Sequence, residues 1–155
     1  MTDANRREML TGSLAGAAGA GALGLMLAGR AQAATMTETE KANVKLVNDF
    51  CAAASGKDAE KLMSFFGANP SYRQTEAQPP AVGPDAVREK FTGMVKVVTK
   101  FEVHESWARG PMVINERTDY FDSPRLKRWH GVGVFMVKDG KILEWQDFTI
   151  DRVTA

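Results

Sequence analysis

The chain has little of the chemistry that builds disulfides or metal sites. Its 155 residues include one cysteine, Cys51, and two histidines, His104 and His130. A single thiol excludes an internal disulfide, and no Cys/His cluster has the spacing of a zinc site. Cys51 falls on the apolar side of an expected helix, which favours a buried and unreactive thiol. We therefore expect no metal site.

An excess of either charge is also missing. Lys and Arg together number 20, and Asp and Glu number 19. Residues 1–33 hold three of the basic and two of the acidic side chains, so that 17 of each sign remain beyond them. A balanced chain without a basic cluster argues against nucleic acid as a partner.

The first 33 residues have the layout of an export signal. Arg6 and Arg7 precede the uncharged run "TGSLAGAAGAGALGLMLAG", and "AQA" follows at residues 31–33. The paired arginines resemble a twin-arginine signal, although a general secretory signal is the alternative. The run is too short and too weakly apolar to favour a membrane anchor. We expect cleavage after Ala33, a periplasmic or secreted protein, and a single domain over residues 34–155.

Helical periodicity dominates the part of the chain that follows this segment. Apolar residues spaced three and four apart predict helices over residues 37–56, 58–67 and 83–98. Potential capping residues precede the first two, and a proline suits the first turn of the third. Residues 68–83 are interrupted by prolines and offer only a short strand around 72–74.

Four strand-like stretches complete the chain. They cover residues 100–108, 111–121, 125–138 and 141–153, and the sequence "KDGK" between the last two predicts a tight hairpin. Helices first and an antiparallel meander afterwards indicate an α+β domain rather than alternating βα units. The predicted fold is a curved antiparallel or mixed sheet packed against three N-terminal helices.

Two of the strands carry charged residues among apolar ones. Arg117 and Asp119 point to the same face of their strand because side chains alternate. Asp147 shares a face with Trp145 on the last strand, and Ile142 falls on the opposite face. Periodicity alone does not decide which of these faces is buried.

Two buried carboxylates with an arginine between them would form a usable pair. The arginine can hold both carboxylates by charge-assisted hydrogen bonds. Burial and mutual repulsion separate their pKa values, which leaves one group ionised and the other protonated. Such a pocket would contain a general base and a general acid. The alternative is a structural ion pair, or an exposed pair on an edge strand.

Three segments resemble limonene-1,2-epoxide hydrolase when taken together and in order. They are "YRQ…QPPAVGPDAV" (residues 72–87), "ERTD" (116–119) and "GKILEWQDF" (140–148). The resemblance implies a curved sheet closed by helices into a cone, a fold shared with nuclear transport factor 2, ketosteroid isomerase and SnoaL-type cyclases. It also implies an active site deep in the cone that needs no metal or organic cofactor.

The resemblance assigns a role to each polar residue of that site. Asp147 would take a proton from water, and Asp119 would protonate the epoxide oxygen. Arg117 would bridge the two carboxylates. Tyr72 would help to hold the attacking water, and Gln74 stands where the family has asparagine. The amide chemistry of the two residues is the same, but glutamine reaches one methylene further.

The same resemblance suggests a pocket for a small lipophilic epoxide. Its expected substrate-binding residues are Phe121, Trp129, Trp145 and Thr149. Trp129 and Gly131 stand where aliphatic residues are expected, and Thr149 replaces an aromatic residue. These departures affect the choice of substrate more than the chemistry.

Two other functions use the same kind of fold. One is proton transfer of the ketosteroid-isomerase or cyclase type, and the other is non-catalytic binding of a small ligand. A homodimer through the outer face of the sheet is also expected. The apolar residues that fall on that face are Met112, Ile114, Val132, Val134 and Met136. His130 is expected to point away from the pocket.

Overall fold

The computed structural model describes residues 35–154, which lie in one compact unit. The proposed export signal, residues 1–33, lies outside the described residues. No helix within residues 35–154 has both the length and the hydropathy to cross a bilayer.

Three α-helices and a six-stranded sheet make up this unit. The helices are α1 (Glu38–Ala53), α2 (Ala59–Met63) and α3 (Pro84–Val97), and a 3-10 turn, η2 (Ala54–Gly56), follows α1. The strands are β1 (Phe66–Arg73), β2 (Ala81–Val82), β3 (Val98–Arg109), β4 (Met112–Phe121), β5 (Leu126–Lys138) and β6 (Lys141–Thr154). The order in the sheet is β2-β1-β6-β5-β4-β3.

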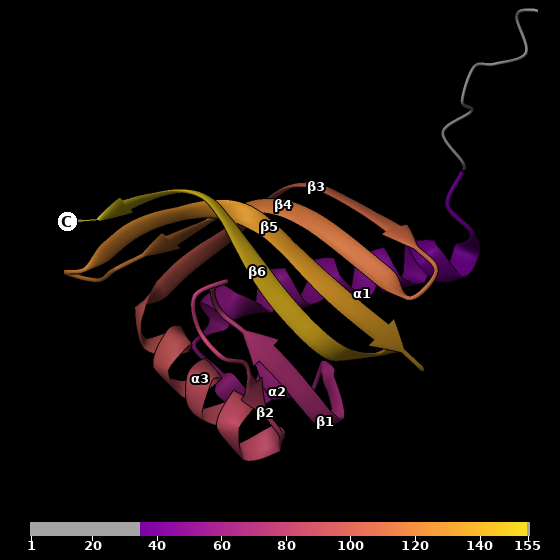
Figure 1. Ribbon diagram of the computed structural model, residues 1–155, viewed down its shortest axis with the longest axis horizontal. Coiled ribbons are helices and arrows are strands. Elements are labelled where there is room, and N and C mark those ends of the chain that lie inside the picture. The colour runs from indigo at the N-terminus through magenta and orange to yellow at the C-terminus, as the bar shows by residue number, and fades with distance from the viewer. Residues whose placement is uncertain (1–34, 155) are drawn as a thin grey trace, which may run out of the picture. The chain divides into compact units, whose positions relative to one another are not determined.

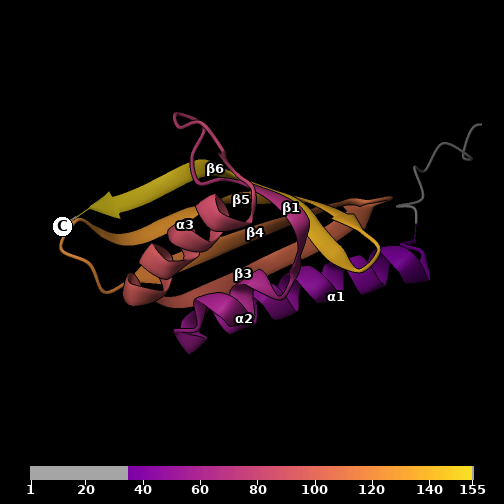
Figure 2. The same cartoon turned by 90° about the horizontal axis from the view of Figure 1, so that it is seen from below.

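The sheet is mixed and curved. β1 pairs with β6 in parallel, and every other pairing is antiparallel. The helices lie on the concave side of the long strands, as Figure 1 and the perpendicular view in Figure 2 show. The α+β fold is therefore confirmed, with the difference that the sheet curves around the helices without closing.

Local signals in the sequence set the start of each helix. Thr37 accepts a hydrogen bond from the backbone N–H of Glu40, whose side chain accepts one from the backbone N–H of Thr37. This reciprocal pair is a capping box. Asp58 caps α2 in a similar way, and Pro84 occupies the first turn of α3.

The predicted hairpin between β5 and β6 is present. Asp139 and Gly140 both have positive φ, 51° and 69°. Two consecutive left-handed residues are what a two-residue type I′ turn requires, and its twist matches that of the flanking strands.

The boundary between α2 and β1 differs from the prediction. The helix ends at Met63, and β1 runs from Phe66 to Arg73, whereas a longer helix and a short strand over 72–74 were expected. The first part of β1 pairs with β6 at Phe66, and the register shifts before Ser71. Pairing with a distant strand overrides the helical pattern of the local sequence.

A second difference concerns Ile142, which was expected on the face opposite Trp145. Both side chains are fully buried. The register between β5 and β6 shifts between Met136 and Val137, which leaves one extra residue in β6. This β-bulge interrupts the alternation, so residues on either side of it can face the same way.

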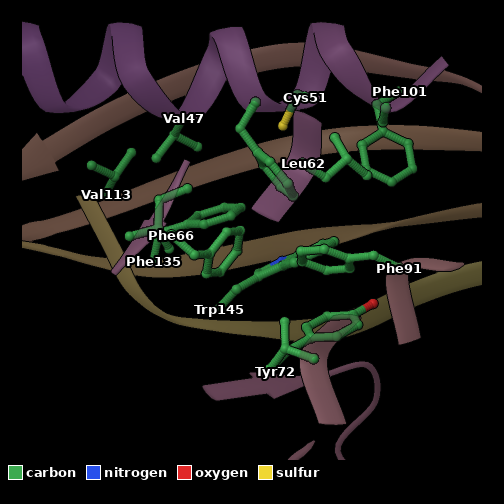
Figure 3. Packing of buried hydrophobic residues seen from close by; sticks show 14 of the residues in the cluster. Val47, Cys51, Leu62, Phe66, Tyr72, Phe91, Phe101, Val113, Phe135 and Trp145 are labelled. Carbon is green, nitrogen blue, oxygen red and sulfur yellow. The ribbon is translucent and has the colours of Figure 1, made fainter. Parts of the chain in front are cut away.

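Aromatic rings fill the space between the helices and the concave face of the sheet. Trp145 stacks on Tyr72 with ring centroids 4.1 Å apart, and Phe135 stacks on its other side at 5.6 Å. Phe50 of α1 contacts the same indole. Phe91 of α3 also contacts it (Figure 3). This core fixes Trp145, which is two residues before Asp147 on β6.

Candidate active site

The two carboxylates and the arginine singled out in the sequence meet on the inner face of the sheet. Arg117 donates from Nε to Oδ1 of Asp119 at 3.0 Å and from Nη2 to Oδ1 of Asp147 at 2.8 Å. The side chain of Arg117 is completely buried, and Asp119 and Asp147 are each 4% exposed. The charged pair on β4 therefore faces inward, and one guanidinium bridges both carboxylates.

Three aromatic rings surround the guanidinium. The Cζ atom of Arg117 lies 5.1 Å from the ring centroid of Phe101, 4.8 Å from that of Trp129 and 5.2 Å from that of Trp145. Such contacts are favourable for a cation and exclude water from it. The rings and the two carboxylates together leave the guanidinium little freedom to move.

Two further residues that determine the position of Arg117 had not been identified from the sequence. Asn115 accepts a hydrogen bond from Nη1 of Arg117 at 3.2 Å, and it donates one to the sulfur of Cys51 at 3.3 Å. Gly133 lies opposite Asn115, and a Cβ added there would overlap Nη1 of Arg117. A signal for this space was visible in the sequence as the glycine pair of "GVGV" within an apolar strand.

The two carboxylates have different environments. Oδ1 of Asp147 accepts a hydrogen bond from the indole N–H of Trp145 at 2.7 Å in addition to that from Arg117. Asp119 has Arg117 as its hydrogen-bond donor, through the single Nε–H. Donors stabilise the ionised form of a carboxyl group. Asp147 is thus better prepared to carry the negative charge.

The pKa values follow from burial and these contacts. Burial raises the pKa of Asp119 to about 7, with Arg117 opposing the shift and the charge of Asp147 adding to it. Burial also raises the pKa of Asp147, but Arg117 and the indole of Trp145 both act to lower it. Burial thus favours a proton on this pair of coupled carboxylates near neutral pH.

The carboxylates open into a pocket of about 450 Å³ between α3, β1 and the inner face of the sheet. The residues that line it are Tyr72, Gln74, Thr75, Gln78, Met94, Phe101, Asp119, Phe121, Arg125, Leu126, Trp129, Asp147, Thr149, Arg152 and Thr154. All of the site residues expected from the sequence are in this lining except Arg117 and Trp145. Arg117 and Trp145 lie behind the carboxylates. Arg117 bridges Asp119 and Asp147, and the indole N–H of Trp145 donates a hydrogen bond to Asp147.

Tyr72 and Gln74 approach the pocket from the end of β1. Tyr72 is 4% exposed, and burial raises the pKa of its hydroxyl well above 10. The phenol therefore remains protonated and can donate a hydrogen bond to a guest in the pocket. Gln74 follows the last residue of β1 and is exposed at the pocket mouth.

The two histidines do not line this pocket. His130 contacts Glu116 with 2.9 Å between Nε2 and Oε1, and His104 contacts the hydroxyl of Thr118 at 2.8 Å. Elsewhere, Cys51 is buried, and burial raises the pKa of its thiol to about 12. Across residues 35–154, no three His, Cys, Asp or Glu side chains are grouped as they would be to hold a metal ion.

Known structures resemble this arrangement of elements. The structure of an LEH-like epoxide hydrolase from M. tuberculosis superimposes on this one with a TM-score of 0.63. The two sequences are 24% identical, and the match covers 72% of this chain and 84% of the hydrolase chain. A second similar structure is SalBIII, an epoxide hydrolase/cyclase-like enzyme with a role in pyran ring formation in the polyether salinomycin. Its sequence is 20% identical, the match covers 70% of this chain and 91% of the SalBIII chain, and the TM-score is 0.64.

A putative ketosteroid isomerase from Kribbella flavida is similar to a comparable degree. It is 15% identical, covers 72% of this chain and 80% of its own, and has a TM-score of 0.62. At these identities the likenesses establish the fold. The model of the SnoaL-like domain matches residues 47–145, which run from the middle of α1 to the Trp145 core. Because this match spans most of the chain, the protein belongs to the SnoaL-like domain family.

Proposed function

We propose that this protein is a cofactor-independent epoxide hydrolase that adds water to a small lipophilic epoxide in one step. The observation that carries the proposal is the Arg117 bridge between Asp119 and Asp147 at the bottom of a partly apolar pocket. Both carboxylates reach the pocket, and the arginine that couples them lies behind it. A base and an acid are thus available to the same bound molecule.

Charge balance favours one proton on the pair of carboxylates. Two ionised carboxylates with one guanidinium would bury a net negative charge, which is costly in a site walled by aromatic rings. One proton makes the cluster neutral. The extra donor from Trp145 favours the charge on Asp147 and so supports the assignment of the proton to Asp119.

The chemical step uses the ionised Asp147 and the protonated Asp119 at the same time. The Asp147 carboxylate takes a proton from water as the water oxygen forms a bond to an epoxide carbon. The bond from that carbon to the epoxide oxygen breaks, and Asp119 gives its proton to this oxygen. The product is a diol, Asp147 is protonated and Asp119 is ionised, so one proton must return from Asp147 to Asp119. Arg117 contacts both groups and stabilises the charge wherever it lies.

The remaining walls suit a small lipophilic guest. Met94, Phe101, Phe121, Leu126 and Trp129 supply apolar surface around the carboxylates. Tyr72 and Gln74 contribute a hydroxyl and an amide that can orient the attacking water. The epoxide hydrolase of M. tuberculosis and SalBIII share the fold and lend support to this choice of reaction.

The test is turnover by the purified chain lacking residues 1–33. We expect conversion of cyclic or terminal epoxides to diols with a chelator present, and entry of ¹⁸O from labelled water into the diol in a single turnover. Asp119→Asn and Asp147→Asn should each lose about a hundredfold or more in kcat, the usual weight of acid–base catalysis. Asp49→Asn, which changes an exposed carboxylate on α1, is the matched control.

Two results would contradict this proposal. Activity that survives both Asp→Asn substitutions would place the chemistry elsewhere. The absence of turnover across a varied epoxide panel, with tight binding of an apolar ligand, would identify a binding protein instead. Circular dichroism and thermal melts should confirm that each variant is folded.

A further inference from the structure

The loop that carries Gln74 begins where β1 stops pairing with β6. The last parallel pairs match Tyr72 with Trp145 and Arg73 with Gln146. The chain then bends at Gln74 and leaves the sheet. If the pairing continued, Gln74 would lie opposite Asp147, and Glu76 opposite Thr149.

A side chain replaces the missing strand at this point. The backbone N–H of Thr149 donates to Oε1 of Glu76 at 2.7 Å, and its hydroxyl lies 3.4 Å from Oε2. The contact joins residues that are 73 positions apart in the sequence. The register between β5 and β6 shifts close to this position, between His130 and Gly131. The Glu76 carboxylate thus extends the β1–β6 register beyond the end of β1.

The same threonine connects this contact to the bottom of the pocket. The indole N–H of Trp129 donates to the hydroxyl of Thr149 at 3.0 Å. The Trp129 ring lies 4.8 Å from Cζ of Arg117. Glu76, Thr149, Trp129 and Arg117 therefore form a continuous series of contacts from the loop to the carboxylates. We call these contacts the loop latch.

We infer that Glu76 is a positioning residue that holds the 74–78 loop against β6 and so keeps Gln74 at the pocket that Asp147 also lines. The inference rests on the proposed function, in which Gln74 orients the attacking water. Gln74, Thr75 and Gln78 line the pocket from this loop, and none of them has a side-chain hydrogen bond of its own within the described residues. Within this loop, Glu76 is the residue whose side chain is hydrogen-bonded to the sheet.

The carboxylate is well suited to this role. Hydrogen bonds from its own backbone and from the Thr149 backbone lower the pKa of Glu76, so it is ionised near neutral pH. An ionised acceptor forms a stronger hydrogen bond than a neutral one. An amide at position 76 would keep one acceptor oxygen, whereas alanine would keep none.

The first experiment measures the latch without any substrate. Exchange of the Thr149 amide hydrogen is followed by NMR in the wild type, Glu76→Gln and Glu76→Ala. We expect exchange about fivefold or more faster in Glu76→Ala, because the amide loses its acceptor, and an intermediate rate in Glu76→Gln. Glu89→Ala, an exposed glutamate on α3, should leave the rate unchanged.

The second experiment asks whether the latch acts through Gln74. A double-mutant cycle combines Glu76→Ala with Gln74→Leu. We expect Glu76→Ala to lower kcat about tenfold with little change in KM, since a misplaced water affects the reaction more than binding. Glu76→Gln should restore part of that loss. In the Gln74→Leu background, Glu76→Ala should have almost no further effect.

The outcomes separate this inference from the proposed function. Unchanged exchange at Thr149 in Glu76→Ala overturns the latch, whether or not the protein hydrolyses epoxides. Faster exchange with additive effects in the cycle overturns the role of Glu76 in holding Gln74. An absence of epoxide turnover in the wild type overturns the proposed function and, with it, the role of Gln74. The exchange rates then still decide whether Glu76 anchors the loop.

Discussion

Nη1 of Arg117 occupies the space that a Cβ would need at Gly133. Gly133 lies opposite Asn115 on one side and Asp147 on the other, so any side chain there would enter the centre of the charged cluster. The glycine on β5 is therefore a requirement of the arginine on β4. Adding a single methyl group, by Gly133→Ala, therefore tests the position of the guanidinium.

Gly133→Ala should displace Arg117 and weaken its bond to Asp147. We expect a loss of about 1–3 kcal/mol in the free energy of unfolding, the usual cost of overpacking a buried site. We also expect at least a tenfold loss of epoxide turnover, because the bridge no longer fits. Urea denaturation and initial rates measure the two effects.

Gly93→Ala provides the matched control. Gly93 lies within α3, and a Cβ added there meets nothing within 4 Å. Because glycine is unfavourable inside a helix, this change should stabilise the protein by up to about 1 kcal/mol. Equal behaviour of the two alanine variants would show that the space beside Arg117 is not restricted.

The rate should fall as the pH rises through about 7. The proposed acid, Asp119, has a pKa raised to about 7 by burial and must be protonated in the reactive state. The descending limb of kcat/KM reports the pKa of that acid in the free enzyme. Rates measured between pH 5 and 9, with the fraction folded checked at each pH, would show it. A profile that stays flat to pH 9 would exclude Asp119 as the acid.

The same pKa predicts how stability changes with pH. Asp119 binds its proton more tightly in the folded state than in the unfolded state, where its pKa is about 3.9. Its contribution is thus complete below about pH 4 and is lost as the pH rises through about 7. Asp119→Asn removes this titration. Relative to the wild type, the variant should gain about 2 kcal/mol in the free energy of unfolding between pH 5 and 8.

Urea denaturation at the two pH values measures that difference. Asp49→Asn, with its exposed carboxylate on α1, should show no comparable change. A wild type and an Asp119→Asn variant that respond identically to pH would mean that Asp119 titrates as it does in the unfolded chain.

We propose that the chain is exported and cleaved after Ala33, as the paired arginines and "AQA" indicate. Mass spectrometry of the exported protein should find a new N-terminus at Ala34. Lysine at both Arg6 and Arg7 should block export if the twin-arginine route is used. Continued export of that variant would instead favour the general secretory route.

We also propose a homodimer through the outer face of the sheet. Two cross-strand pairs, Met112 with Met136 and Ile114 with Val134, form an apolar surface on β4 and β5. In the single chain these four side chains are only partly covered. Light scattering should give twice the monomer mass, and Val134→Glu should give a monomer because it places a charge in the contact. A monomeric wild type would contradict this proposal.

Short-range signals in the sequence were enough to predict most of the elements. Thr37 caps α1 and the pair Asp139–Gly140 turns the last hairpin, because capping and turn formation depend on residues a few positions apart. The three helices and the four long strands followed from hydrophobic period. The α2–β1 boundary did not follow, because the pairing partner of Phe66 lies in β6, far along the chain.

Resemblance to a known family indicated which polar residues to examine, but not how they are held. Periodicity left open whether Arg117 and Asp119 face inward, and the tertiary structure buries both. The contacts of Asn115 and Glu76, and the side chain that fills the space at Gly133, became known only from the three-dimensional structure. Gly133 acts on Arg117 of the neighbouring strand, and Glu76 acts on Thr149 of β6, through strand pairings that no local pattern specifies. The sequence by itself thus determined the elements and the chemical groups, whereas the non-local pairing of strands determined which groups meet.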